Sequence, residues 1–169
     1  MGADHTGRDH TGGADRIPIP VDPDTPPARP LHLQLPALGL VFAGGVAGTG
    51  LRYLMEELFP TVGTGWPWAT FGVNLAGAFI LGVILEVMIL AGPDSGWRQR
   101  VRLLVGTGFC GSLTTYSTFA LETTQLGQHG AAGIAIAYAV TSVVAGIACA
   151  WLGIVAAGSI LARRTGAVS

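Results

Sequence analysis

The sequence contains no lysine and little charge of any kind. Nine basic residues, all of them arginine, stand against ten acidic residues, and only 11% of the 169 positions are charged. Soluble domains carry about a quarter charged residues, so an ordinary soluble domain is excluded. A net charge of -1 also argues against a nucleic-acid partner, which requires a concentrated basic face. Half of the residues are apolar, which indicates a membrane protein.

Cysteine and proline are scarce where they would shape the fold. Cys110 and Cys149 both lie in apolar segments, which excludes a disulfide framework and makes each a small packing residue. No proline follows Pro93. Any break in a later helix must therefore come from glycine and hydroxyl residues.

Residues 1–36 mix Gly, Asp, Thr, Arg and Pro with few apolar side chains. Such a segment cannot offset its ordering entropy, so we predict a disordered N-terminal extension before a membrane domain at residues 37–169. It lacks the apolar stretch and small-residue cleavage site of a signal peptide. Scattered histidines in this segment are not expected to hold a metal: His5, His10 and His32.

Four apolar stretches follow, each near or above the ~20 residues that cross a bilayer. They cover residues 37–55, 68–91, 103–121 and 130–161. The sequence therefore predicts an all-α membrane protein with four transmembrane helices. An even number of crossings places both termini on one side of the membrane.

Arginines near the spans are distributed unevenly between the two sides. Only Arg52 lies on the side of the first and third connections. The side of the termini holds Arg29, Arg98, Arg100, Arg102, Arg163 and Arg164. The excess of arginine in cytoplasmic loops predicts that both termini lie in the cytoplasm.

Small residues recur at helical spacing in the first two spans. Gly44 and Gly48 lie about one turn apart, and Ala76, Gly77 and Ala78 form a cluster in the second span. Such residues let helix backbones approach closely in lipid. We expect most of them to serve helix packing.

The stretch GFCGSLTTYSTF, residues 108–119, carries six hydroxyls and two glycines without a charge or a proline. This composition favours a helix that breaks, because hydroxyls can satisfy the freed backbone groups. A break leaves bare carbonyls that suit a hard cation such as sodium, and bare N–H groups that suit an anion. A hydroxyl-lined helix interface without an ion is the alternative.

Uncharged polar side chains also occur inside the other spans. Asn74 lies in the second span, and Tyr138 and Ser142 lie one turn apart in the fourth. Together with the hydroxyls of the third span they predict a track of neutral hydrogen-bond donors. Such a track suits a small anion that must also leave easily. Asn74 can alternatively be interhelical packing glue, and the acids Glu86 and Glu122 fall near span ends.

The chain resembles the Fluc/CrcB family of fluoride channels over residues 37–164. The resemblance rests on GGVAGTGLRY in the first span, TFGVNLAGAF in the second and GFCGSLTTYSTF in the third. It implies an antiparallel dimer of four-helix subunits with a broken third helix, two fluoride pores and a structural sodium ion at the dimer centre. The extension before Pro36 lies outside the resemblance.

The resemblance also implies roles for individual residues. Backbone carbonyls of Gly111 and Thr114 would hold the sodium ion, and Tyr116 and Phe119 would turn their ring edges toward fluoride. Asn74 matches the pore asparagine. The other implied positions are Ser117 and Thr118 as hydroxyl donors, Tyr138 and Ser142 as the polar track, Arg52 as the vestibule arginine and Glu122 at the pore mouth.

Two departures from the family pattern bear on function. Tyr116 stands where phenylalanine is common, so we expect conduction at an altered rate. The six-to-one distribution of arginines predicts a fixed orientation. A heterodimer with an oppositely inserted paralogue and a homodimer both remain open.

The function that the resemblance implies is passive export of fluoride across the plasma membrane. No GxxxxGK[ST] motif indicates an ATP site. A four-span proton-coupled antiporter of the multidrug type is the alternative, but it needs an acid deep in the first span, where Glu56 and Glu57 come only at the end. A partner subunit that does not conduct also remains open. An intramembrane hydrolase, which pairs a serine with histidine or aspartate, is not expected because every histidine lies outside the spans. The resemblance to a family of channels implies that the chain is not an enzyme.

Overall fold

The structure, a computed structural model, describes residues 34–91 and 96–166, without the side chains of 164–166. Every regular element in these ranges is a helix, and they contain no strand. This confirms the all-helical prediction for the described part of the chain. The extension predicted at residues 1–36, with its three histidines, falls almost entirely outside the described residues.

The first two helices closely follow the predicted spans. Helix α1, Leu35–Leu58, begins two residues before the predicted start. Pro36 is accommodated in its first turn, where the missing N–H has no intrahelical partner to lose. Helix α2 covers Trp68–Ala91, the predicted residues, and follows Pro67 directly.

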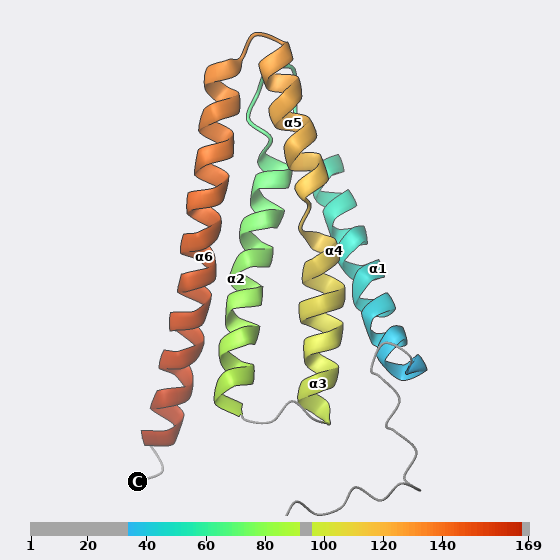
Figure 1. Ribbon diagram of the computed structural model, residues 1–169, viewed down its shortest axis with the longest axis vertical. Coiled ribbons are helices and arrows are strands. Elements are labelled where there is room, and N and C mark those ends of the chain that lie inside the picture. The colour runs from blue at the N-terminus through green and yellow to red at the C-terminus, as the bar shows by residue number, and fades with distance from the viewer. Residues whose placement is uncertain (1–33, 92–95, 167–169) are drawn as a thin grey trace, which may run out of the picture.

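The third apolar stretch is broken. It begins with α3, Trp97–Val101, and continues as a π-helix, η2, over Arg102–Cys110. A short turn, α4, covers Gly111–Leu113, and α5 resumes at Tyr116–Gln128. Between them Thr114 and Thr115 are extended, with ψ values of 151° and 124°. The gap between α4 and α5 is visible in Figure 1, and it confirms the predicted break.

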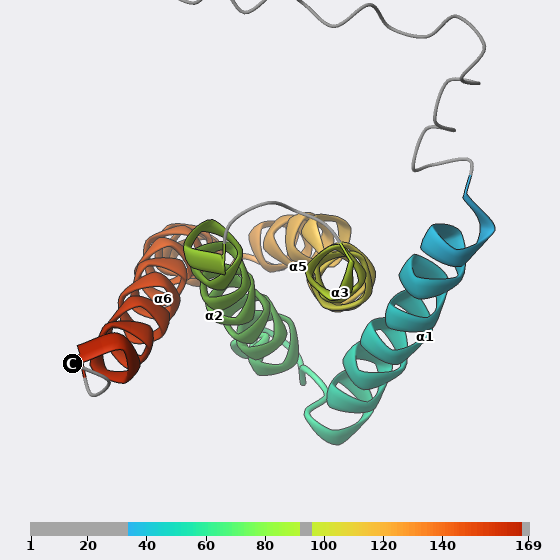
Figure 2. The same cartoon turned by 90° about the horizontal axis from the view of Figure 1, so that it is seen from below.

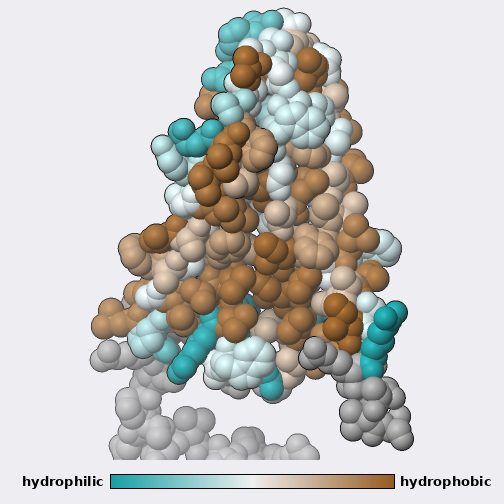
Figure 3. Space-filling view, turned by 180° about the vertical axis from the view of Figure 1, so that it is seen from behind, coloured by the Kyte–Doolittle hydropathy of each residue, from teal (hydrophilic) through white to brown (hydrophobic). Residues whose placement is uncertain are grey.

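The last helix, α6, runs over Ala132–Gly166. In the described residues, three helices are long and apolar enough to cross a membrane: α1, α2 and α6. The pieces of the broken segment are each shorter than a span. Apolar side chains cover the middle of the molecule in Figure 3, and polar ones gather near its two ends. The chain is a multi-pass membrane protein.

Glycines set the closest helix contacts. A Cβ atom at Gly44 or Gly48 of α1 would meet backbone atoms of η2, and one at Gly108 of η2 would lie 2.6 Å from the Val41 carbonyl. Close contacts of this kind confirm the packing predicted for Gly44 and Gly48. Seen from below, the α3 end of the broken segment lies between α1 and α2 (Figure 2).

Helices α2 and α6 form the second close pair. Gly82 of α2 faces the backbone of Ala150, and Gly153 of α6 faces the backbone of Phe79. Towards the end where α5 turns into α6, a small core of Leu126, Ala135 and Tyr138 packs against four further apolar residues. These are Trp66, Phe71, Phe119 and Ala131.

Candidate functional site

The break in the third segment is held by its own threonines. The Thr114 hydroxyl donates to the Cys110 carbonyl at 2.9 Å, and the Thr114 N–H donates to the same oxygen at 3.1 Å. Thr115 caps the N-terminus of α5, because its Oγ1 accepts the N–H of Thr118 at 3.2 Å. Each half of the segment thus ends on a local threonine contact.

Asn74 fastens the break to α2. Its Oδ1 accepts the N–H of Thr115 at 2.8 Å, and its Nδ2 donates to the carbonyl of Thr115 at 3.2 Å. The amide thus pairs with both backbone groups of one extended residue, as a neighbouring strand would. Unpaired backbone groups cost several kcal/mol each in lipid, roughly, so this pair supports an extended residue at that depth.

The largely uncharged cavity beside the break, which we call the central cavity, has a volume of about 500 Å³. Among the described residues that line it, none carries a charge. Ser142 contributes a buried hydroxyl for which the described residues offer no hydrogen-bond partner. The lining consists of Asn74, Gly77, Ala78, Leu81, Gly106, Cys110, Gly111, Thr114, Thr115, Tyr116, Phe119, Ser142 and Val143.

Aromatic rings lead away from the central cavity. The ring centroids of Tyr116 and Phe119 lie 6.2 Å apart, and those of Phe119 and Tyr138 lie 5.2 Å apart. Tyr116 is 82% exposed, whereas Tyr138 is fully buried. Tyr138 also meets Trp66 edge to face at 5.5 Å. The predicted pair of aromatics therefore belongs to a longer series of rings.

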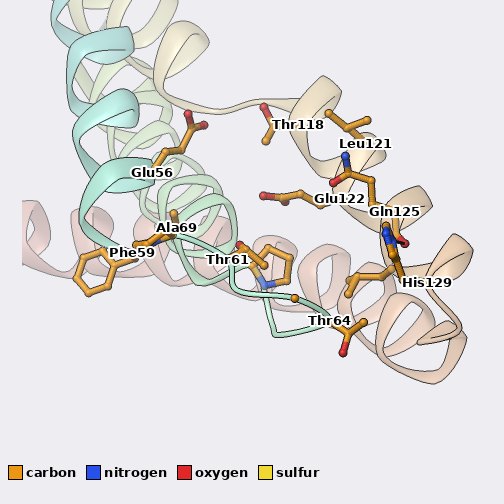
Figure 4. A pocket seen from close by; sticks show the side chains of 14 residues that line it. Glu56, Phe59, Thr61, Thr64, Ala69, Thr118, Leu121, Glu122, Gln125 and His129 are labelled. Atoms are coloured by element: carbon orange, nitrogen blue, oxygen red, sulfur yellow. Dashed lines mark hydrogen bonds between the residues drawn. The ribbon is translucent and has the colours of Figure 1, made fainter.

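A second cavity, the loop-side cavity, lies between the end of α1 and α5 and has a volume of about 410 Å³. Glu56 from α1 and Glu122 from α5 point into it (Figure 4). The two oxygens of the Glu122 carboxylate accept hydroxyl hydrogen bonds, from Thr70 at 2.7 Å and from Tyr138 at 2.8 Å. This network joins α2, α5 and α6 around one acidic group.

A third, open hollow lies between α1 and the break, and we call it the arginine hollow. Arg52 lines it together with Gly111, Thr114, Tyr116 and Ser117, and its volume is about 530 Å³. The Arg52 guanidinium lies 4.0 Å from the carboxylate of Glu56, which partly offsets its charge. Thr49, Ser112 and Thr115 complete the lining.

The backbone at the break fits a cation held by carbonyl oxygens. In a continuous helix the N–H of Thr115 would donate to the Gly111 carbonyl, and that of Thr118 to the Thr114 carbonyl. Both N–H groups donate to side chains instead. The carbonyls of Gly111 and Thr114 have thus lost their helical donors, and bare carbonyl oxygens are ligands that a hard cation prefers.

The residues predicted to form the site do not share one cavity. Asn74, Tyr116, Phe119 and Ser142 meet at the central cavity, with Gly111 and Thr114. Thr118 and Glu122 line the loop-side cavity, and Arg52 and Ser117 line the arginine hollow. Tyr138 links the first two, since its ring contacts Phe119 and its hydroxyl binds Glu122.

Sequence reasoning did not single out Thr115 or Thr70. Thr115 occupies an N-cap position, and a threonine three residues before Thr118 at the start of a helix is a readable capping signal. Thr70 is fully buried and lies four residues before Asn74, on the same face of α2. A search for polar residues at this spacing would have found it.

These features define an all-helical multi-pass membrane protein with an uncharged polar cavity at a helix break. The family model of the CrcB-like protein, Camphor Resistance (CrcB), matches residues 39–154. The chain belongs to the CrcB family. This confirms the resemblance that the three sequence motifs indicated.

Several relatives are similar over most of their length. "Fluoride-specific ion channel FluC 1" of Cutibacterium acnes is 43% identical over 128 residues, 76% of this chain and 90% of the relative. "Fluoride-specific ion channel FluC 2" of Leifsonia xyli subsp. xyli is 42% identical over 135 residues, 80% and 92% of the two chains. "Fluoride-specific ion channel FluC" of Chlorobaculum tepidum is 44% identical over 117 residues, 68% and 88%. These names describe ion channels, which are not enzymes.

Proposed function

We propose that this protein is a fluoride channel that lets the anion leave the cytoplasm passively. The observation that carries the proposal is the central cavity, which lies at the helix break and is lined by neutral groups alone among the described residues. The names of the relatives point to the same ion. The inside-negative membrane potential suffices to drive the anion outward.

Fluoride needs strong hydrogen bonds in exchange for its water. The second N–H of the Asn74 amide, the buried Ser142 hydroxyl and the ring edges of Tyr116 and Phe119 supply neutral partners around the cavity. A fixed cation there would hold the ion too long for rapid exit. From the cavity the proposed path passes Phe119 and Tyr138 to the loop-side cavity.

The proposed working unit is a dimer of antiparallel copies, each with four crossings. Helix α5 leaves Tyr116 82% exposed, and Gly111 and Ser117 are exposed too. A second copy covering this face would bring two further carbonyls to those of Gly111 and Thr114. A sodium ion there would neutralise the bare carbonyl dipoles and hold the copies together.

Orientation follows from the arginines. In Figure 1 the ends of α2 and α6 and the start of α3 share one end of the molecule, where Arg98, Arg100 and Arg163 lie. We infer that this end faces the cytoplasm of a bacterial-type plasma membrane. The same bias favours a heterodimer with an oppositely inserted paralogue, although a homodimer has the same proposed pores.

The decisive experiment is fluoride efflux from liposomes that contain this protein alone, measured with a fluoride electrode. Fluoride release that needs no pH gradient, with chloride retained in matched vesicles, supports the channel. Efflux coupled to an opposing proton gradient would indicate an antiporter instead. Absence of efflux from the single chain, restored by adding a paralogue, would identify an obligate heterodimer, and silence in both would contradict the proposal.

A further inference from the structure

We propose that Asn74 and Thr115 keep the cation site open by capturing two backbone N–H groups. Thr115 donates its own N–H to the Asn74 side chain, and the Thr115 side chain accepts the N–H of Thr118. These are the two N–H groups that an unbroken helix would return to the carbonyls of Gly111 and Thr114. Thr115 is therefore a positioning residue for the cation, which it does not touch with its side chain. The inference rests on the sodium site of the proposed function.

The register of the helical hydrogen bonds shows which carbonyls lose their donors at the break. An α-helical N–H donates to the carbonyl four residues earlier, so Thr115 belongs to Gly111 and Thr118 belongs to Thr114. Each N–H donates to a side-chain oxygen instead: that of Thr115 to Asn74 Oδ1 at 2.8 Å, and that of Thr118 to Thr115 Oγ1 at 3.2 Å. The two carbonyls released are also the two that the family resemblance implies as sodium ligands. The hydrogen bonds at Thr115 thus account for the release of both carbonyls.

The Thr115 hydroxyl has every hydrogen-bonding position occupied. It donates to the Thr118 hydroxyl at 3.1 Å, accepts the Thr118 N–H, and lies 3.2 Å from the Ser117 hydroxyl, which then donates to it. A hydroxyl offers one donor and two acceptor positions. A side chain saturated in this way is held in one rotamer, so the cap cannot easily release the N–H.

The preceding residue is fixed as well. The Thr114 hydroxyl is bound to the Cys110 carbonyl, and the Thr114 methyl group packs on Gly77 so closely that a Cβ at Gly77 would overlap it. Thr114 therefore has little freedom to turn back into a helical conformation. Helix α2 contributes both Gly77 and Asn74, so it supports the break at two positions.

The test measures sodium binding without reference to transport. The melting temperature of the purified protein is recorded at a series of sodium concentrations, with choline making up the ionic strength. Its dependence on sodium concentration gives the sodium affinity, since a ligand of the folded state stabilises that state. We expect sodium to raise the melting temperature of the unmodified chain. Thr115→Val, which lacks the capping oxygen, is expected to need about tenfold more sodium for the same rise, a loss of about 1.4 kcal/mol. Thr115→Ser restores the affinity to within about twofold because it keeps the hydroxyl.

Thr124→Val is the matched control. Its hydroxyl also binds a backbone carbonyl, that of Ala120 at 2.8 Å, but on the exposed side of α5 away from the break. Its sodium response should equal that of the unmodified chain. Should Thr115→Val not fold, Thr115→Gly replaces it, since glycine is accepted at an N-cap position and also lacks the oxygen.

Two results would overturn the inference: an unmodified chain indifferent to sodium, or a Thr115 variant without the oxygen that responds like the unmodified chain. Fluoride efflux from the same preparations separates the two proposals. A sodium response that depends on Thr115, without efflux from the single chain or after a paralogue is added, contradicts the proposed function and leaves the inference about Thr115 standing. Efflux without a sodium response contradicts the inference about Thr115 and supports the proposed fluoride channel.

Discussion

Two regions of this molecule are stabilised within the membrane in opposite ways. Where α1 meets η2, Gly44 and Gly48 leave no room for a Cβ, and backbone lies on backbone. At the break, a Cβ at Gly111 would meet nothing within 4 Å, and side chains satisfy the backbone instead. The first region is held by shape and the second by hydrogen bonds.

The two regions have different roles: the glycine contacts stabilise the helix bundle, and the break forms the candidate site. Lipid offers no hydrophobic drive between helices, so glycine contacts stabilise the bundle through packing. The break, in contrast, exposes polar backbone at membrane depth, which is tolerated only beside a cavity or within protein. The side chains that make this tolerable, Asn74 and Thr115, also line the central cavity.

The largest effect on stability is expected at a glycine of the contact between α1 and η2. Gly44→Ala puts a methyl group onto the carbonyl of Leu104, so the helices must separate, at a cost of about 3 kcal/mol or more. We expect loss of folded protein, measured by size-exclusion chromatography and thermal unfolding in detergent. Gly50→Ala on the same helix, where a Cβ meets nothing within 4 Å, is the control and should fold normally. If both variants folded equally well, the close contact of α1 with η2 at Gly44 would not be needed for stability.

A substitution at the break should reduce transport more than stability. Asn74→Asp keeps an acceptor for the Thr115 N–H but loses the donor to the Thr115 carbonyl and adds a negative charge at the cavity. Two like charges about 4 Å apart repel by about 4 kcal/mol at an effective dielectric constant of about 20, so fluoride efflux should fall at least about 100-fold. Gln128→Glu, at the exposed end of α5, adds the same charge elsewhere and should retain efflux. Undiminished efflux from Asn74→Asp would deny Asn74 a place at the pore.

An intermediate effect is expected at the Glu122 network. Glu122→Gln replaces one carboxylate oxygen by an NH2 group, so one of the two part-buried hydroxyls, Thr70 or Tyr138, loses its charged acceptor. The free energy of unfolding should fall by about 1–3 kcal/mol. Thermal unfolding measures it, with Glu57→Gln on the exposed face of α1 as control. A stability equal to that of the control would show that the network adds nothing to folding.

The smallest effect should come from the Arg52–Glu56 pair. Its atoms are 4.0 Å apart, and the side chains are 26% and 37% exposed, so water and salt screen much of the attraction although Glu56 Oε1 itself is buried. Glu56→Gln should change the free energy of unfolding by about 0.5 kcal/mol or less, and raising the salt to about 1 M should erase the change. A larger loss that survives high salt would indicate a buried role for this pair.

Much of the fold could be predicted from the sequence. The second span was predicted to the residue, and α1 and α6 begin within two residues of their predicted starts. Long apolar runs bounded by proline and charge are strong local signals. The π-helical form of Arg102–Cys110 was not predicted, because no pattern of residue types distinguishes it from an α-helix.

The site was less predictable than the spans. Glycine and hydroxyl residues indicated a break, but its position at Thr114 and Thr115 depends on Asn74, a residue 41 positions away from Thr115. The division of the predicted residues among three cavities likewise required the folded chain. Tyr138 and Ser142 lie one turn apart, yet one binds Glu122 and the other faces the central cavity.

By itself the sequence determined that the chain crosses a membrane as helices, that glycine brings these helices together, and that the third of its apolar stretches is interrupted. These properties depend on residues close together along the chain, through propensity, hydrophobicity and spacing. Only the tertiary structure decided which carbonyls lose their donors and which side chains take them, because hydrogen bonds between α2 and the break depend on where two distant segments meet in space.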